Sequence, residues 1–418
     1  MILVRRPACS ATPFYAMMHN RPTVDRQVAG TASMMDILMY FALCRKAGGF
    51  YLEKKMRSGY TTGACAAAGV KAALLFLQGE YCEKVHLLAL DGTPLLIPVR
   101  RVEKTGRGVK AEIVKDSGDD PDITNGVSVF TEVCLCPKPG IVFKAGAGIG
   151  TVTKAGLSVP PGEPSINPGP RQLIANVVTE LLGEKAGIEV TISIPAGTEL
   201  AKRTLNPILG VVGGISVIGT TGVVRPMSEE GFKNSLVPQI DVAKAAGYTS
   251  LVFVPGKIGE TAAIASGLPR QAIVQTSNFI GFMLEAAAKR KIERILLFGH
   301  IGKLVKVAAG VFYTHNRIGD ARLETMAAYA AAEGLPAAGV CRILTATTTE
   351  DALPVLDAHG LQRVYAILAA RASARAQRYI FDELQVGTVM STLQGRLLGM
   401  DDKAKEIGRD LKWNIKLS

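Results

Sequence analysis

The sequence predicts a two-domain protein, in which an α+β front domain is followed by a Rossmann-like parallel βαβ domain with a helical C-terminal part. The 418 residues are enough for two or three domains of roughly 100–200 residues each. Apolar residues make up 48% of the chain, so it can bury a sizeable core. The chain has 44 glycines and only one tryptophan, which suits a loop-rich α/β enzyme better than an all-β recognition module.

Residues 1–55 differ in composition from the rest of the chain. This segment holds eight basic and three acidic residues, and 6 of the 12 methionines of the chain. It shows no sustained hydrophobic periodicity before about Met34. We interpret it as an N-terminal extension, partly disordered, or as the product of a misassigned start, with the polypeptide beginning near Met34 or Met56.

Residues 56–204 mix strands with a few helices, which predicts the α+β front domain. Helices are expected over 64–78, opened by a Thr-Thr-Gly turn, and over 171–182, after a Gly/Pro-rich connector at 146–170. Asp91-Gly92 is typical of a hairpin turn. Strands are expected over 85–90, 95–99, 108–115, 127–136 and 188–194.

Residues 205–418 have the regular alternation of strands and helices that predicts a parallel sheet. Apolar strands are expected over 215–218, 251–254, 272–275 and 295–298, with helices over 228–246 and 279–291. The Ala-rich stretch 320–384 reads as mostly helical, and 386–391 as a last strand.

Several classes of protein are disfavoured. No apolar stretch approaches the ~20 residues needed to span a membrane, and no secretory signal is evident. Seven scattered cysteines are typical of reduced thiols in the cytoplasm, and Cys134 and Cys136 lack a second pair, so we expect no metal site. The net charge of +12 is scattered with few interleaved aromatics, so nucleic acid is not expected. A small polyanion in a basic cleft would use this charge, and a merely soluble cationic surface is the alternative interpretation.

Small or polar residues follow all four strands predicted between 215 and 298. They are Gly219-Thr220-Thr221-Gly222, then Gly256, then Asn278, then His300. Ligands of open parallel sheets gather at the carboxyl ends of the strands, so this edge is expected to bind a nucleotide-like or adenosyl ligand. Ordinary turn glycines are the alternative interpretation.

Lys303 and Lys306 follow His300 and share one helix face. Two such lysines can clamp carboxylates, while His300 can accept or relay a proton. A structural histidine remains the alternative.

An acidic run, Asp116 with Asp119, Asp120 and Asp122, admits two interpretations. It can attract a cation or keep one carboxyl protonated, or it can be a turn capped by its own side chains. Gly146 to Lys154 resembles a phosphate-binding loop without a P-loop ending, and Arg171 at a helix start indicates anion binding.

Seven dispersed segments share a pattern with one protein family. They are 57–67 (Arg-Ser-Gly-Tyr-Thr-Thr-Gly-Ala-Cys-Ala-Ala), 117–126, 148–154, Ile166-Asn167-Pro168 with Arg171, Thr204-Leu205-Asn206-Pro207 with Gly210, 213–222 and 299–304. In this order they resemble the CbiD family, the cobalt-precorrin-5B methyltransferases that act at carbon 1 in anaerobic cobalamin biosynthesis. The resemblance spans roughly Met56 to Met400. It departs at Gly169, where a larger residue is expected, and at residues 1–33, which have no counterpart.

The resemblance implies transfer of a methyl group from S-adenosylmethionine to carbon 1 of cobalt-precorrin-5B, giving cobalt-precorrin-6A, with cobalt arriving only in the substrate. An anionic cobalt-tetrapyrrole would be the partner, without nucleic acid or membrane. Hand-over to neighbouring pathway enzymes and an oligomeric state stay open, as do two alternatives, a nucleotide-dependent oxidoreductase and a non-catalytic tetrapyrrole carrier.

The residues of the predicted site fall into three roles. We expect catalytic roles for Asp119, Asp120 and His300, and donor binding by Gly219, Thr220, Thr221, Gly222, Gly256 and Asn278. We expect substrate binding by Thr61, Thr62, Lys154, Asn167, Arg171, Lys303 and Lys306.

Overall fold

The structure, a computed structural model, describes residues 56–226 and 228–413 as a mixed α/β protein with several sheets. The N-terminal extension predicted for residues 1–55 lies outside the described residues.

The front sheet has five strands, and its residues alternate between a buried and a solvated face. Its order is β4 (Arg101–Lys104), β5 (Val109–Val114), β6 (Ser128–Leu135), β9 (Gly187–Ser193) and β7 (Gly140–Ala145). Only the β9–β7 pair is parallel. Because alternate side chains of a strand point to opposite faces, one face of this sheet must be covered.

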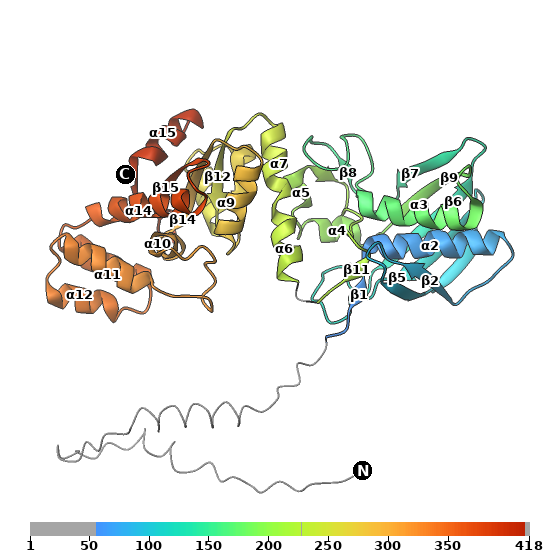
Figure 1. The fold of residues 1–418 in the computed structure, drawn as a ribbon, viewed down its shortest axis with the longest axis horizontal. Helices are drawn as coiled ribbons and strands as arrows, with labels where there is room; N and C mark the ends of the chain where they lie inside the picture. Colours follow the sequence, from blue (N-terminus) through green and yellow to red (C-terminus); the bar gives the residue numbers. More distant parts are fainter. Residues whose placement is uncertain (1–55, 227, 414–418) are drawn as a thin grey trace, which may run out of the picture. The chain divides into compact units, whose positions relative to one another are not determined.

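Two helices, α2 (Thr62–Leu77) and α3 (Pro168–Leu182), supply that cover and lie side by side, as Figure 1 shows in blue and green. Thr61 starts α2 by accepting a hydrogen bond from the Ala64 amide at 3.2 Å. A Cβ at Gly69 would lie 2.7 Å from the hydroxyl oxygen of Thr131 on β6, so α2 packs closely on the sheet. The predicted helix after the Thr-Thr-Gly turn is confirmed.

Three short strand pairs complete the front part. The predicted hairpin is confirmed as β2 (Lys84–Leu88) and β3 (Pro94–Pro98), joined through Asp91-Gly92. The other two pairs join residues far apart in the sequence: β1 (Gly59–Tyr60) with β11 (Val223–Val224), and β8 (Thr151–Val152) with β10 (Val211–Val212).

The strand predicted over 215–218 is not part of the parallel sheet. Its residues instead form isolated bridges to the connector, Ile215 to Ile149 and Val217 to Ile166. A short apolar run satisfies either environment, and here the free backbone groups of the connector compete successfully for it.

The second large sheet has the order β13 (Ile273–Gln275), β12 (Ser250–Val254), β14 (Arg294–His300), β15 (Gln385–Ser391) and β16 (Leu397–Met400). Its first four strands are parallel and β16 is antiparallel. All five residues of β12 are buried, because helices cover both faces. The parallel strands predicted near 251, 272, 295 and 386 are confirmed.

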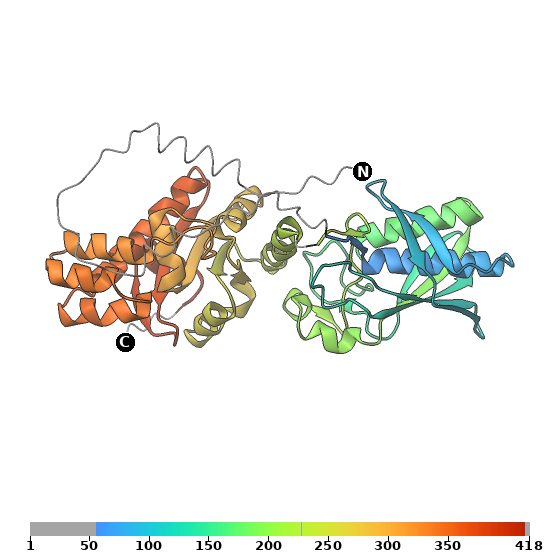
Figure 2. The ribbon, with the colours of Figure 1, turned by 90° about the horizontal axis from the view of Figure 1, so that it is seen from below.

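Helices divide between the two faces of this sheet. Phe253 and Leu297 face a core with α9 (Ile280–Lys289), α10 (Ile301–Ala309) and α14 (Arg363–Tyr379). Val252 and Leu296 face a smaller core with α8 (Lys257–Ala265) and α15 (Asp402–Asp410). The helical stretch 320–384 is confirmed, and α11 (Arg322–Ala332) packs against α12 (Ala337–Leu344) in both Figure 1 and Figure 2. The remaining helices are α4 (Gly197–Ala201), α5 (Asn206–Leu209), α6 (Glu229–Leu236), α7 (Pro238–Ala245), the 3₁₀ turn Arg270–Ala272 and α13 (Thr349–Ala358).

The single helix predicted over 228–246 is wrong in one respect, since it is two helices. Pro238 begins α7 directly after α6, because proline lacks the amide hydrogen that a continuous helix would need at that turn.

No described helix is long and apolar enough to cross a membrane. Within residues 56–226 and 228–413, no three His, Cys, Asp or Glu side chains gather in a way that could hold a metal ion.

The glycine at position 169 is required by close packing. A Cβ there would lie 2.3 Å from the carbonyl oxygen of Gly219, closer than real contacts allow.

We expect Gly169→Ala to lower the free energy of unfolding by about 1–3 kcal/mol, measured by chemical denaturation. Gly106→Ala is the control, because a Cβ at Gly106 meets nothing within 4 Å. Equal stability of the two variants would contradict the close packing.

Candidate functional site

The carboxyl ends of four parallel strands meet at one edge of the second sheet. The chain runs from β12 to β13 on one side and then to β14 on the other. This reversal makes a topological switch point between β12 and β14, the place where open α/β sheets bind ligands. Gly256, Asn278 and His300 come at this edge, as predicted.

Lys303 and Lys306 lie on the face of α10 that approaches the edge. The ammonium groups of both lysines donate to the carbonyl oxygen of Thr314, at 3.3 Å and 3.4 Å. Lys303 also bonds the Asn278 side chain at 2.6 Å, and Lys306 the Asn316 side chain at 2.9 Å. The prediction that the two lysines share a face is confirmed.

Neither lysine forms an ion pair with a carboxylate of residues 56–226 or 228–413. Lys306 has an exposed fraction of 0%. Burial lowers the pKa of both lysines, and the neighbouring charge of Lys306 lowers that of Lys303 further. The acid close enough to affect Lys306, Asp320, is already bonded by both Nε and Nη2 of Arg322. The edge therefore holds cationic charge that a bound anion would neutralise.

Both ring nitrogens of His300 have partners. Its Nδ1 accepts from the Gly302 amide at 3.2 Å, which caps α10, so the hydrogen is on Nε2. Nε2 donates to Oε1 of Glu350 at 2.9 Å. Burial lowers the pKa of His300, only partly offset by the hydrogen bond to Glu350. The neutral ring is hydrogen-bonded at both nitrogens, so it is placed to orient Glu350.

Glu350 is the residue that sequence reasoning missed. It lies in the first turn of α13, and its Oε1 also accepts from the Leu393 amide after β15, at 2.9 Å. Thr348 and Asp351 form a capping box around it, at N–O distances of 3.0 Å and 3.2 Å. That capping signal, Thr-x-x-Asp, was available in the sequence and places an acid at a helix start, although nothing local places it beside His300.

Gly219 to Gly222 do not join the other predicted donor-binding residues. This loop lies against the amino end of α2, where Gly222 accepts from the Thr61 amide at 2.9 Å and Ile218 from the Gly63 amide at 3.0 Å. Thr62 both donates to and accepts from the Ile218 backbone. The predicted single edge is wrong for Gly219, Thr220, Thr221 and Gly222, because the run before them leaves the parallel sheet.

Asn167 and the acidic run also lie in the front part. The Asn167 amide donates to the Val217 carbonyl at 3.0 Å. Asp119 accepts from the Arg57 amide at 2.7 Å, and the Asp120 amide donates to Ser117. The buried ammonium of Lys115 bonds Asp122 at 2.7 Å. The run is a turn held partly by its own side chains, since Asp116 accepts from the Gly118 amide at 2.8 Å and Asp122 from the Thr124 amide at 2.7 Å. Arg57, remote in sequence, also pairs with Asp116, so both interpretations hold in part.

Lys154 and Arg171 have protein partners in separate places. Lys154 donates to the Ile208 carbonyl at 3.0 Å and lines a cavity of about 630 Å³ with Arg270. Arg171 bonds Glu163 at 2.6 Å and lies over the Phe143 ring, 5.0 Å from its centroid. The charge of Arg171 is thus compensated within the protein.

Comparisons with known proteins agree on one family. The CbiD family model matches residues 51–226, and the model of the CbiD C-terminal domain matches residues 313–402. A protein of Moorella thermoacetica named cobalt-precorrin-5B C(1)-methyltransferase is 49% identical over 86% of this chain and 99% of its own length. Proteins of the same name from Desulfitobacterium hafniense and Methanocaldococcus jannaschii are each 45% identical, over 85% and 83% of this chain and 92% and 97% of their own.

A crystal structure of a cobalamin biosynthesis protein (CbiD) from Archaeoglobus fulgidus is 28% identical. The match covers 64% of this chain and 84% of that one, with a TM-score of 0.34.

The lowered pKa of His300 has a consequence for stability. As the pH falls, this histidine takes up its proton in the unfolded chain first, near pH 6.5. The free energy of unfolding therefore decreases from that pH down to the lower pKa of folded His300. We expect His300→Asn, which keeps a capping oxygen, to remove this part of the acid sensitivity.

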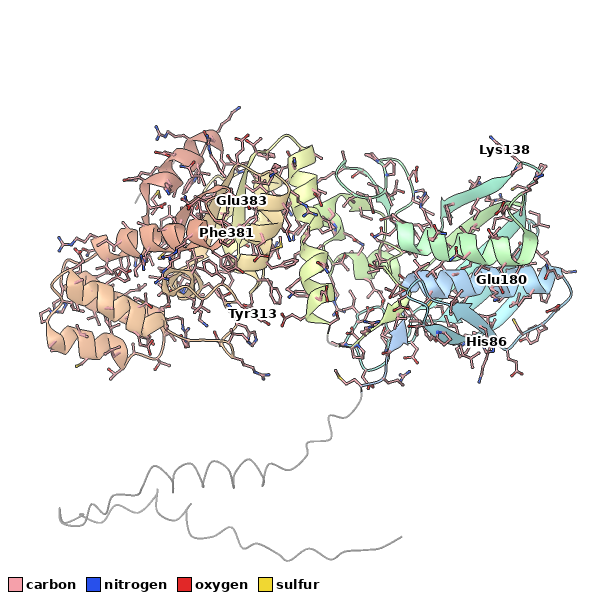
Figure 3. All side chains as sticks on the ribbon, viewed as in Figure 1. His86, Lys138, Glu180, Tyr313, Phe381 and Glu383 are labelled. Carbon is pink, nitrogen blue, oxygen red and sulfur yellow. The ribbon has the colours of Figure 1, made fainter. Side chains whose placement is uncertain are left out.

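The measurement is the free energy of unfolding between about pH 7 and pH 5. His86→Asn is the control, because His86 is exposed on β2 (Figure 3) and should leave the wild-type pH dependence unchanged. An identical slope in wild type and His300→Asn would rule out the contribution of His300.

Proposed function

Because this chain belongs to the CbiD family of C-methyltransferases, we propose that it transfers a methyl group from S-adenosylmethionine to carbon 1 of cobalt-precorrin-5B, on the anaerobic route to cobalamin. The observation that carries the proposal is the pair of lysines at the carboxyl edge of the parallel sheet without an acidic partner there. A substrate with several side-chain carboxylates supplies the missing counter-charge.

We also propose that the chain has two domains. The front part would extend to Val224, because β10 and β11 pair with front strands. The parallel sheet with its helices would form the second, Rossmann-like domain. This boundary replaces the one expected after residue 204.

The adenosyl donor would bind at the switch point between the carboxyl ends of β12 and β14. A Cβ at Gly256 would meet nothing within 4 Å, so open space follows the end of β12. Gly299 at the end of β14 packs on Pro255, where a Cβ would be 2.8 Å from the ring, which keeps the two strand ends close. The donor supplies an electrophilic methyl group on sulfur, and Gly256 and Asn278 would line its site.

The chain's own residues contribute positioning more than covalent chemistry. Methyl transfer is an in-line displacement, so holding donor and acceptor aligned and dry can supply ~7–11 kcal/mol of the barrier. Lys303 would anchor a carboxylate of the tetrapyrrole, and buried Lys306 would strengthen the local positive potential behind it. Cobalt enters as part of the substrate.

We also propose that the enzyme is cytoplasmic. The five cysteines of the described part are unpaired, which supports a cytoplasmic enzyme.

The test is a single-turnover assay with purified protein, methyl-labelled S-adenosylmethionine and cobalt-precorrin-5B. We expect one labelled methyl group on the macrocycle by mass spectrometry. Pigment binding without labelled product would indicate the carrier alternative, and binding of reduced nicotinamide would indicate the oxidoreductase.

Lys303→Gln should raise the KM for the pigment about 10- to 100-fold, because one charge-assisted hydrogen bond is worth about 1.5–3 kcal/mol. Lys289→Gln, at the exposed end of α9, is the matched control and should leave KM unchanged. Equal KM values for the two variants would exclude Lys303 from pigment binding.

A further inference from the structure

Only one of the two carboxylate oxygens of Glu350, Oε1, accepts hydrogen bonds from the described residues. Oε1 accepts from both His300 and Leu393, each at 2.9 Å. Oε2 has no hydrogen-bond partner among the described residues, and a quarter of the side chain is exposed. A carboxylate fixed through one oxygen leaves the other free to accept a proton.

The position of Glu350 is rigid. Besides the capping box, the amino ends of α10 and α13 meet behind it, since a Cβ at Gly302 would lie 3.0 Å from the Thr349 hydroxyl oxygen. Thr349 is buried, with an exposed fraction of 1%. A carboxylate held in this way is preorganised for catalysis.

The surroundings of Glu350 suit a large, partly apolar substrate. The turn that carries Leu393 lies against α8, since a Cβ at Gly395 would be 3.3 Å from that of Ala262. Leu393 and Ile258 of α8 have exposed fractions of 46% and 55%. Of the charged groups, Lys303 and Arg322 interact electrostatically with His300, and Arg396 and Glu350 itself interact with Tyr365.

The proposed reaction needs a base. The nucleophilic ring carbon forms a bond to the methyl carbon, and the carbon–sulfur bond breaks with its electron pair going to sulfur, which becomes a neutral thioether. The macrocycle gains the positive charge that sulfur loses. It returns to its former charge when a proton leaves a nitrogen or carbon of the conjugated system.

We propose that Glu350 is a catalytic residue of this methyl transfer, the base whose Oε2 takes that proton. The inference rests on the proposed function and replaces His300 in the role expected from the sequence. His300 becomes a positioning residue, because its Nδ1 is used in the cap and its Nε2 proton orients Glu350.

The experiment compares Glu350→Gln with wild type in single turnover, with cobalt-precorrin-5B and labelled donor. We expect methyl transfer to slow about 10²- to 10⁴-fold, the usual contribution of a general base. Dissociation constants for donor and pigment, and the unfolding midpoint, should stay unchanged. Glu383→Gln is the matched control, because exposed Glu383 (Figure 3) precedes β15, at the opposite end of that strand from Leu393, and should transfer at the wild-type rate.

Glu350→Ala separates base catalysis from mere positioning. Acetate added to this variant should restore much of the rate, since a small carboxylate can occupy the vacated space and accept the proton.

Full activity of Glu350→Gln, or a slow Glu350→Ala that acetate does not accelerate, would overturn the assignment while leaving the methyltransferase intact. Absence of transfer by the wild-type enzyme would instead overturn the proposed function, and the base with it.

Discussion

Burial of the parallel sheet on both faces is the constraint from which the arrangement of the functional edge follows. Helices cover both sides, so β12 carries five apolar or small residues in a row and has no place for a functional polar side chain along its length. Polar groups can only collect where the strands end. Because four strands run in the same direction, their carboxyl ends bring Gly256, Asn278, His300 and the Leu393 turn to one edge.

The same burial explains why a lysine at this edge lowers the stability of the fold. Lys306 is enclosed by the core around α10, and its ammonium group meets only neutral oxygens. A buried charge without a counter-charge destabilises the fold unless the pKa shifts or an anion binds. Under the proposed function, retaining the lysine would trade stability of the free protein for affinity toward the anionic substrate.

The sequence was informative where the physics is local. The Thr61 cap, the Asp91-Gly92 hairpin and the buried strands at 251, 295 and 386 follow from capping, turn and apolar patterns, and all were predicted. Patterns that depend on remote partners were not readable. Residues 215–218 look like any other buried strand, and only their bridges to Ile149 and Ile166 reveal that they belong elsewhere.

The candidate site shows the same division. Strand-end residues such as His300 and Asn278 could be predicted, because topology brings strand ends together. Glu350 could not, since it reaches His300 across 50 residues through a helical excursion that no local pattern describes. The glycine loop at 219–222 was misplaced for the corresponding reason, its partners being the amino end of α2, far away in sequence.

Because β14 pairs with β15, the parallel sheet closes late during synthesis of the chain. These neighbours are separated by the whole of α10 to α14, so a growing chain must release about one fifth of its length before the sheet can close. Until then Glu350 can accept a hydrogen bond from His300 but not from the Leu393 amide. A nascent or truncated chain that stops before β15 thus has an incomplete edge. Methyl transfer should therefore begin only after β15 and the Leu393 turn have been synthesised.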